Sequence, residues 1–186
     1  MIYPIVVYGD PVLRKKAVDI KSNHPKLAEL IEDMFETMYY CSGVGLAAPQ
    51  IGKSIRLFVI DTTPFADEDE EAEGYKKVFI NAHIVEEEGG KWKFNEGCLS
   101  IPGIREDVDR KEYLTLRYMD ENFVEHVEEF SGIIARVIQH EYDHIDGVLF
   151  TDKLSPLRKR LIKGKLADIS KGITDADYKI KVYQRK

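Results

Sequence analysis

The chain has 186 residues, of which 44% are hydrophobic and 10% aromatic, and its formal net charge is −6 at pH 7. This size and composition predict a single globular domain over residues 1–186 and exclude a largely disordered chain. Residues 1–4 lack the basic and apolar regions of a signal peptide, and no segment approaches membrane-spanning length. We therefore expect a cytoplasmic protein with no membrane partner, in which both cysteines stay reduced.

The charge is unevenly distributed along the chain. Six acidic residues fall in a loop at about 66–74, which we expect to be solvated and mobile. The C-terminal segment 151–186, by contrast, carries 11 Lys or Arg against 4 Asp. Such a basic segment can meet nucleic acid, although a solvated helix face is the simpler interpretation.

Hydrophobic periodicity predicts the order of the secondary-structure elements. A helix is expected over about 24–40, a second over about 132–146 and a third over about 155–169. Strand-like runs lie between the first two helices, at 55–61, 77–86, 90–94, 106–109, 113–119 and 123–130. Because these runs show no regular βαβ alternation, we predict an α+β fold in which mainly antiparallel sheets pack around the second helix, with an N-terminal and a C-terminal helix.

The second helix contains the sequence His140-Glu141-Tyr142-Asp143-His144. Two imidazoles four residues apart share one helix face, and a glutamate beside the first supplies a base, which is the pattern of a metal site. We expect Ser131 to be the N-cap, and the apolar stripe that follows it runs into the histidine pair and buries it. A shared metal ion would offset the unfavourable burial of two imidazoles.

Two histidines leave a tetrahedral ion short of one protein ligand. The downstream Glu or His that zinc proteases with this motif commonly use is missing, since position 150 is Phe150 and neither residue type occurs after His144. The third ligand is therefore an Asp or lies upstream. Upstream, Cys98 lies in a Gly-flanked turn and offers a soft thiolate ligand. A lone Cys is more often a small buried hydrophobe, but the incomplete ligand set favours the ligand interpretation.

A third segment, Gly43-Val44-Gly45-Leu46-Ala47-Ala48-Pro49-Gln50, is built of small residues and ends in an amide. Such a segment lets a backbone or an extended ligand approach closely, and the amide can donate a hydrogen bond to an oxyanion. Taken alone, it is more simply interpreted as a helix-to-strand turn with an incidental Gln.

Together, GVGLAAPQ at 43–50, EGCLS at 96–100 and QHEYDH at 139–144 resemble, in order and spacing, the three signature motifs of the peptide deformylase family. The resemblance covers about residues 6–156, and the acidic loop and the C-terminal end depart from it. It implies hydrolysis of the N-formyl group of the formylmethionine that begins newly made proteins, with release of formate. It also implies one divalent metal ion, Fe(II) in the cell, with Zn, Ni or Co in preparations, bound by Cys98, His140 and His144.

The resemblance further implies roles for the residues around the ion. Glu141 would take a proton from the attacking water and return it to the departing amine. The Gln50 amide and the Leu99 backbone N–H would bind the developing oxyanion.

Two further expectations concern the surroundings of the site. By the resemblance, Glu96 would pair with Arg105 and so orient the Cys98 loop, the alternative being a pair of surface charges. An apolar pocket for the methionine side chain would be lined by residues near the motifs: Val44, Gly45, Leu99, Ile133 and Val137, with Arg136 at its mouth.

The expected partners are N-formylmethionyl nascent peptides, with no DNA. Members of the resembled family can dock on the ribosome through a C-terminal extension, so the basic segment 151–186 is a candidate ribosome contact. Two other functions stay open. A metalloprotease would use the same Glu141 chemistry, but the missing downstream ligand argues against it. A structural-zinc binding module would need a fourth protein ligand, for which the sequence offers no candidate as good as water.

Overall fold

A computed structural model describes residues 1–184 of the chain. Within this range there are three α-helices, α1 (Leu27–Tyr40), α2 (Gly132–Ile145) and α3 (Pro156–Ile169). The strands are β1 (Ile5–Val6), β2 (Gly45–Ala47), β3 (Leu57–Asp61), β4 (Lys76–Cys98), β5 (Ile101–Met119), β6 (Glu125–Phe130) and β7 (Ile180–Lys181). Residues 185 and 186, which belong to the predicted basic segment, lie outside the described residues.

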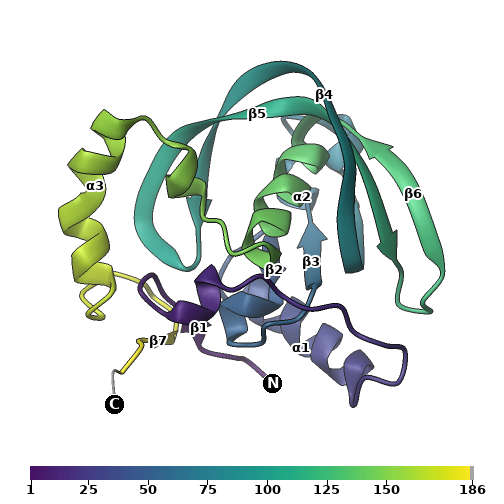
Figure 1. The fold of residues 1–186 in the computed structure, drawn as a ribbon, viewed down its shortest axis with the longest axis horizontal. Helices are drawn as coiled ribbons and strands as arrows, with labels where there is room; N and C mark the ends of the chain where they lie inside the picture. Colours follow the sequence, from purple (N-terminus) through teal and green to yellow (C-terminus); the bar gives the residue numbers. More distant parts are fainter. Residues whose placement is uncertain (185–186) are drawn as a thin grey trace.

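The strands form two sheets. One is antiparallel, in the order β2-β3-β4-β5-β6, and the other is the parallel pair β1-β7. The long strands β4 and β5 arch over α2, and α3 lies at one side, away from α1 (Figure 1). The predicted α+β class, with mainly antiparallel strands and a helix toward each end of the chain, is confirmed.

Strand β3 shows how the core is organised, because all four residues of 57–60 are fully buried. Successive side chains of a strand point to opposite faces. Phe58 and Ile60 accordingly pack in the cluster that includes α2, whereas Leu57 and Val59 pack in the cluster that includes α1. The sheet is therefore covered by a helix on each face at β3, which explains a continuous apolar run rather than an alternating one.

Some boundaries differ from those predicted. Helix α1 begins at Leu27 rather than at about 24, because Lys26 adopts a left-handed conformation with φ of 54°. The two runs expected at 77–86 and 90–94 form the single strand β4. Gly89, with φ of 77°, lies within a register shift between Glu88 and Lys91, so this position is a bulge and not a turn. The runs at 106–109 and 113–119 likewise form one strand, β5.

The start of α2 is held by the acidic loop. Ser131 is the N-cap, as predicted, but its side chain makes no capping hydrogen bond. Instead, the Ile133 N–H donates to Asp69 Oδ2 at 3.2 Å, and a carboxylate at this end is favoured by the helix dipole. Gly132 fits this arrangement, because it has φ of 59° and a Cβ there would lie 2.7 Å from the same Asp69 oxygen. The loop is thus anchored, and not wholly solvated as expected.

None of the helices within residues 1–184 combines the length and the apolar character that crossing a bilayer requires.

Candidate active site

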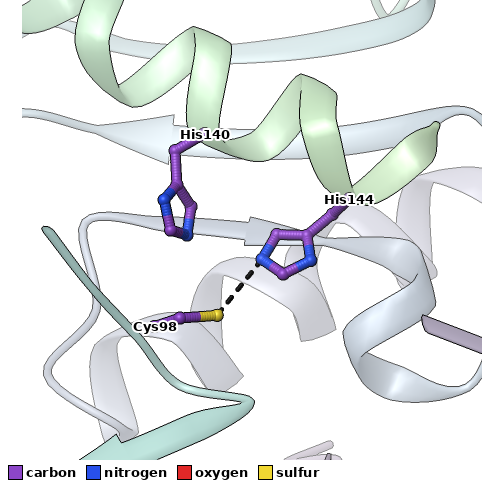
Figure 2. Close-up of side chains that lie close together, drawn as sticks. All are labelled: Cys98, His140 and His144. Atoms are coloured by element: carbon purple, nitrogen blue, oxygen red, sulfur yellow. Dashed lines mark hydrogen bonds between the residues drawn. The ribbon is translucent and has the colours of Figure 1, made fainter. Parts of the chain in front are cut away.

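The two histidines of α2 point toward Cys98, which ends β4 (Figure 2). Cys98 Sγ lies 3.2 Å from His144 Nε2, and one ligand atom of each of Cys98, His140 and His144 lies within 4.8 Å of the others. One thiol and two imidazoles are a donor set that fits a divalent transition metal. The structure therefore brings the three predicted ligands together in an arrangement that can hold an ion.

Gln50 lies beside this cluster. It belongs to a short 3-10 helix, Ala48–Ile51, directly after β2. Its Oε1 accepts from the Ala47 N–H at 2.8 Å, which turns the amide nitrogen toward the Cys98 turn. Gln50 Nε2 is 3.6 Å from Cys98 Sγ and 3.3 Å from Ser100 Oγ. The amide is therefore fixed with its donor facing the site.

Glu96 is the centre of a buried network behind the histidines. Its carboxylate accepts from Arg110 Nε at 2.7 Å and Nη2 at 2.9 Å, and from Arg136 Nη1 at 3.1 Å. His140 Nδ1 is 2.9 Å from Glu96 Oε2. Burial alone would raise the pKa of Glu96, but hydrogen bonds from Arg110 and His140 hold that pKa well below its usual range. The carboxylate orients the His140 ring and leaves its Nε2 free for an ion.

The predicted pairing of Glu96 with Arg105 is wrong. Arg105 is exposed and donates to the Asn95 side chain at 2.9 Å and to the Asn95 carbonyl at 2.7 Å. Along β4 and β5, Asn95 and Arg105 lie on the exposed face, whereas Glu96 and Arg110 lie on the buried face. Alternation of side chains along a strand separates the two pairs.

Glu141 sits buried beside the cluster. Burial raises its pKa to about 7, although the nearby His140 lowers it in part. Its Oε2 has no hydrogen-bond partner in the described chain. Gly45 makes this placement feasible, because a Cβ there would collide with Glu141 Oε1. A buried carboxyl with an unsatisfied oxygen and a pKa near neutrality is suited to bind a water molecule and exchange a proton with it.

Burial lowers the pKa of His144 well below its usual value, which favours the neutral form that binds metals. For His140, burial would also lower the pKa, but hydrogen bonds to Cys98 and Glu96 raise it well above the usual value, so an ion bound at Nε2 would take the place of a proton.

A pocket of about 770 Å³ opens onto the cluster. Its walls include Val44, Gly45, Leu99 and Val137, as predicted for the apolar side-chain pocket. Ile133 is not part of the wall. It is buried in the core cluster that contains Phe79 and Phe130, one turn of α2 before Val137.

Arg110 was not predicted as a site residue, and Arg136 was predicted only at the pocket mouth. Arg110 joins Glu96 to α2 by also donating to Asp143 Oδ2 at 2.7 Å. Arg136, expected at the pocket mouth, does line the pocket, but its side chain is 2% exposed and bonds Glu96. The sequence pattern could have indicated the role of Arg110. Arg110 lies an even number of residues from the buried Ile104 and Val108, so the three side chains share one face of β5, and a charge on a buried face needs a partner.

Comparison with known proteins agrees with this geometry. A family model described as polypeptide deformylase matches residues 2–160. A peptide deformylase from Christiangramia forsetii is 59% identical and covers 97% of this chain and 96% of its own, and one from Flavobacterium johnsoniae is 60% identical over the same shares. The chain belongs to the peptide deformylase family. It is thus an enzyme of the hydrolase class that this family name denotes.

Solved structures of peptide deformylases share the fold. The structure of one from Legionella pneumophila is 40% identical, covers 92% of this chain and 96% of its own, and superposes with a TM-score of 0.79. A Plasmodium falciparum peptide deformylase in complex with an inhibitor is 35% identical, covers 90% of this chain and 99% of its own, and superposes with a TM-score of 0.78.

Proposed function

We propose that this deformylase removes the formyl group from the N-terminal formylmethionine of newly made proteins in a metal-dependent reaction, releasing formate. The observation that carries the proposal is the position of Glu141. Its carboxylate Oε2, which has no hydrogen-bond partner within residues 1–184, lies beside the Cys98, His140 and His144 cluster, on the wall of the pocket. This arrangement supports the proposal, because it would bring a base, a set of metal ligands and a space for substrate together.

Cys98, His140 and His144 would hold the ion, and a set of three protein ligands would leave room for a water molecule. A bound divalent cation lowers the pKa of water and polarises a carbonyl group. Glu141 would accept the proton from the attacking water and deliver it to the amine nitrogen as the bond between the formyl carbon and that nitrogen breaks. The products are formate and a free N-terminus.

Two donors of the chain would stabilise the negative charge that develops on the formyl oxygen. The Gln50 amide nitrogen is fixed toward the site by the Ala47 N–H bond to its oxygen. The Leu99 N–H belongs to the turn after Cys98, which lies on the same wall of the pocket. Donors held in place before the reaction stabilise a transition state without reorganisation.

The methionine side chain would occupy the apolar part of the pocket beside Val44, Leu99 and Val137. Its unbranched thioether chain suits an apolar cavity of irregular shape. The thiolate of Cys98 favours a soft or borderline ion, and Fe(II) is the proposed ion in the cell, with Zn, Ni or Co as substitutes.

The setting of the reaction is also proposed. The substrates are nascent chains in the cytoplasm, and the basic segment is a candidate ribosome contact. Helix α3 supports this, because Lys159, Arg160 and Lys163 are exposed on it. Arg158 of the same helix instead forms an intramolecular ion pair, since it donates to both carboxylate oxygens of Glu106, at 2.8 and 2.6 Å.

One experiment separates deformylation from proteolysis. Purified protein is incubated with an N-formyl-Met peptide and with the matched unformylated peptide, while formate and new amines are measured. We expect equal amounts of formate and amine from the formylated peptide, and no fragments from the unformylated one. Internal cleavage of the unformylated peptide would instead show a metalloprotease, and metal retention without either reaction would show a structural site.

A further inference from the structure

The C-terminal segment after α3 forms part of the pocket wall. Residues 173–178 all line the pocket, as do Cys98 and Leu99. They are held in place by the strand that follows, because β7 pairs with β1 through Ile5 N–H to the Lys179 carbonyl at 2.9 Å and Val7 N–H to the Lys181 carbonyl at 3.2 Å. The N-terminal strand β1 therefore holds the segment that follows α3.

Tyr178 reaches from this segment to the Cys98 turn. Its hydroxyl donates to the Leu99 carbonyl at 2.8 Å, and its ring packs against the core cluster that contains Met38 and Cys41. Burial raises the pKa of Tyr178, and the neighbouring Cys98 and Cys41 raise it further, so the hydroxyl keeps its proton and acts as a donor. The bond joins residues 79 positions apart in the sequence.

The turn that Tyr178 contacts needs such support. Leu99 and Ser100 connect β4 to β5 where Cys98 pairs with Ile101, and neither residue has a positive φ. Two-residue hairpin turns usually have a positive φ, because those turn types match the twist of the strands. Here both turn carbonyls are bound from outside, since Ser100 O accepts from the Tyr8 N–H at 2.8 Å and Leu99 O accepts from Tyr178.

We propose that Tyr178 is a positioning residue, which fixes the Leu99–Ser100 turn so that the Leu99 N–H points at the oxygen of the scissile formyl group. The inference rests on the proposed function, because it uses the oxyanion role of Leu99. Tyr178 does not touch the reacting atoms. It acts by restricting rotation about the backbone bonds of Leu99, and so the C-terminal segment belongs to the working site.

The test is Tyr178→Phe, which keeps the ring and removes the donor. Steady-state kinetics on an N-formyl-Met peptide, metal content and amide hydrogen exchange at Tyr8 are measured. We expect kcat to fall by about three- to tenfold, the range for loss of one hydrogen bond, with KM within about twofold and metal content unchanged. Exchange at the Tyr8 amide, which donates to the Ser100 carbonyl of the turn, should become faster. Tyr183→Phe is the matched control, since Tyr183 is exposed in the same segment and its hydroxyl has no bond among the described residues.

The possible results distinguish failure of the positioning role of Tyr178 from failure of the proposed function. A wild-type enzyme that releases formate, with an unchanged kcat for Tyr178→Phe, would overturn the positioning role and leave the proposed function intact. A rise in KM at unchanged kcat would also overturn it, because the segment would then act only in substrate binding. Joint loss of metal and kcat would show a structural role instead. If wild type releases no formate, the proposed function fails first.

Discussion

Replacing Glu96 by Gln is the sharpest perturbation of the network behind the metal ligands. The Glu96 side chain is 4% exposed and neutralises Arg110 and Arg136, which are 3% and 2% exposed. Removing one partner of a buried ion pair costs about 3–5 kcal/mol, because the other charge is left uncompensated. Asp143 still neutralises Arg110 in the Glu96→Gln variant. We therefore expect a loss at the lower end of that range, about 3 kcal/mol in the free energy of unfolding.

For a chain of this length, that loss corresponds to a fall in Tm of about 6–12 °C. Because Glu96 also orients His140, metal affinity should fall by roughly 10- to 100-fold. The assays are thermal unfolding and a competitive metal titration. Arg105→Ala is the control, since Arg105 bonds only Asn95 among residues 1–184, and it should change stability by about 0.5 kcal/mol or less. Equal losses in the two variants would refute the network described here.

Three further predictions concern other parts of the molecule. Asp69→Ala should lower the unfolding free energy by about 1 kcal/mol, because the Ile133 N–H at the start of α2 loses its acceptor. Asp67→Ala, at an exposed position of the same loop, should leave the unfolding free energy unchanged. Denaturant titration compares the two variants, and equal unfolding curves would contradict the capping role of Asp69. Gln50→Ala should keep its metal and lose about a hundredfold or more in kcat, and an unchanged kcat would remove Gln50 from the oxyanion site. The iron form should lose activity in air through oxidation of the ion or of Cys98 while the nickel form persists, as followed by timed assays; equal lifetimes would count against iron.

The local patterns of the sequence predicted the elements that carry the motifs. The stripe of α2 was expected over about 132–146 and extends over Gly132–Ile145. Cys98 was singled out because two histidines leave a ligand set incomplete, and the structure places its sulfur beside His144. The helix follows from short-range periodicity, and the Cys98 ligand follows from the number of ligands that an ion needs. Both can be read from a single sequence.

The contacts between distant segments were not predictable in this way. The partner of Glu96 depends on the β4–β5 register, which pairs Glu96 with Glu106 and places Arg105 opposite Gly97. The sequence alone does not give that register, because bulges shift it. Strand β7 is two residues long and has no detectable pattern. Its role, and that of Tyr178, appears only when β7 is placed beside β1.

We propose that Cys98 and Glu141 have separate roles, in which Cys98 holds the ion and Glu141 moves the proton. The most direct test is metal content and kcat measured side by side for Cys98→Ala and Glu141→Gln. We expect Cys98→Ala to lose its metal. Glu141→Gln should bind metal nearly stoichiometrically and lose about a hundred- to ten-thousandfold in kcat, as removal of a general acid–base residue does. Near-wild-type turnover in Glu141→Gln, or retained metal and activity in Cys98→Ala, would contradict the assignment.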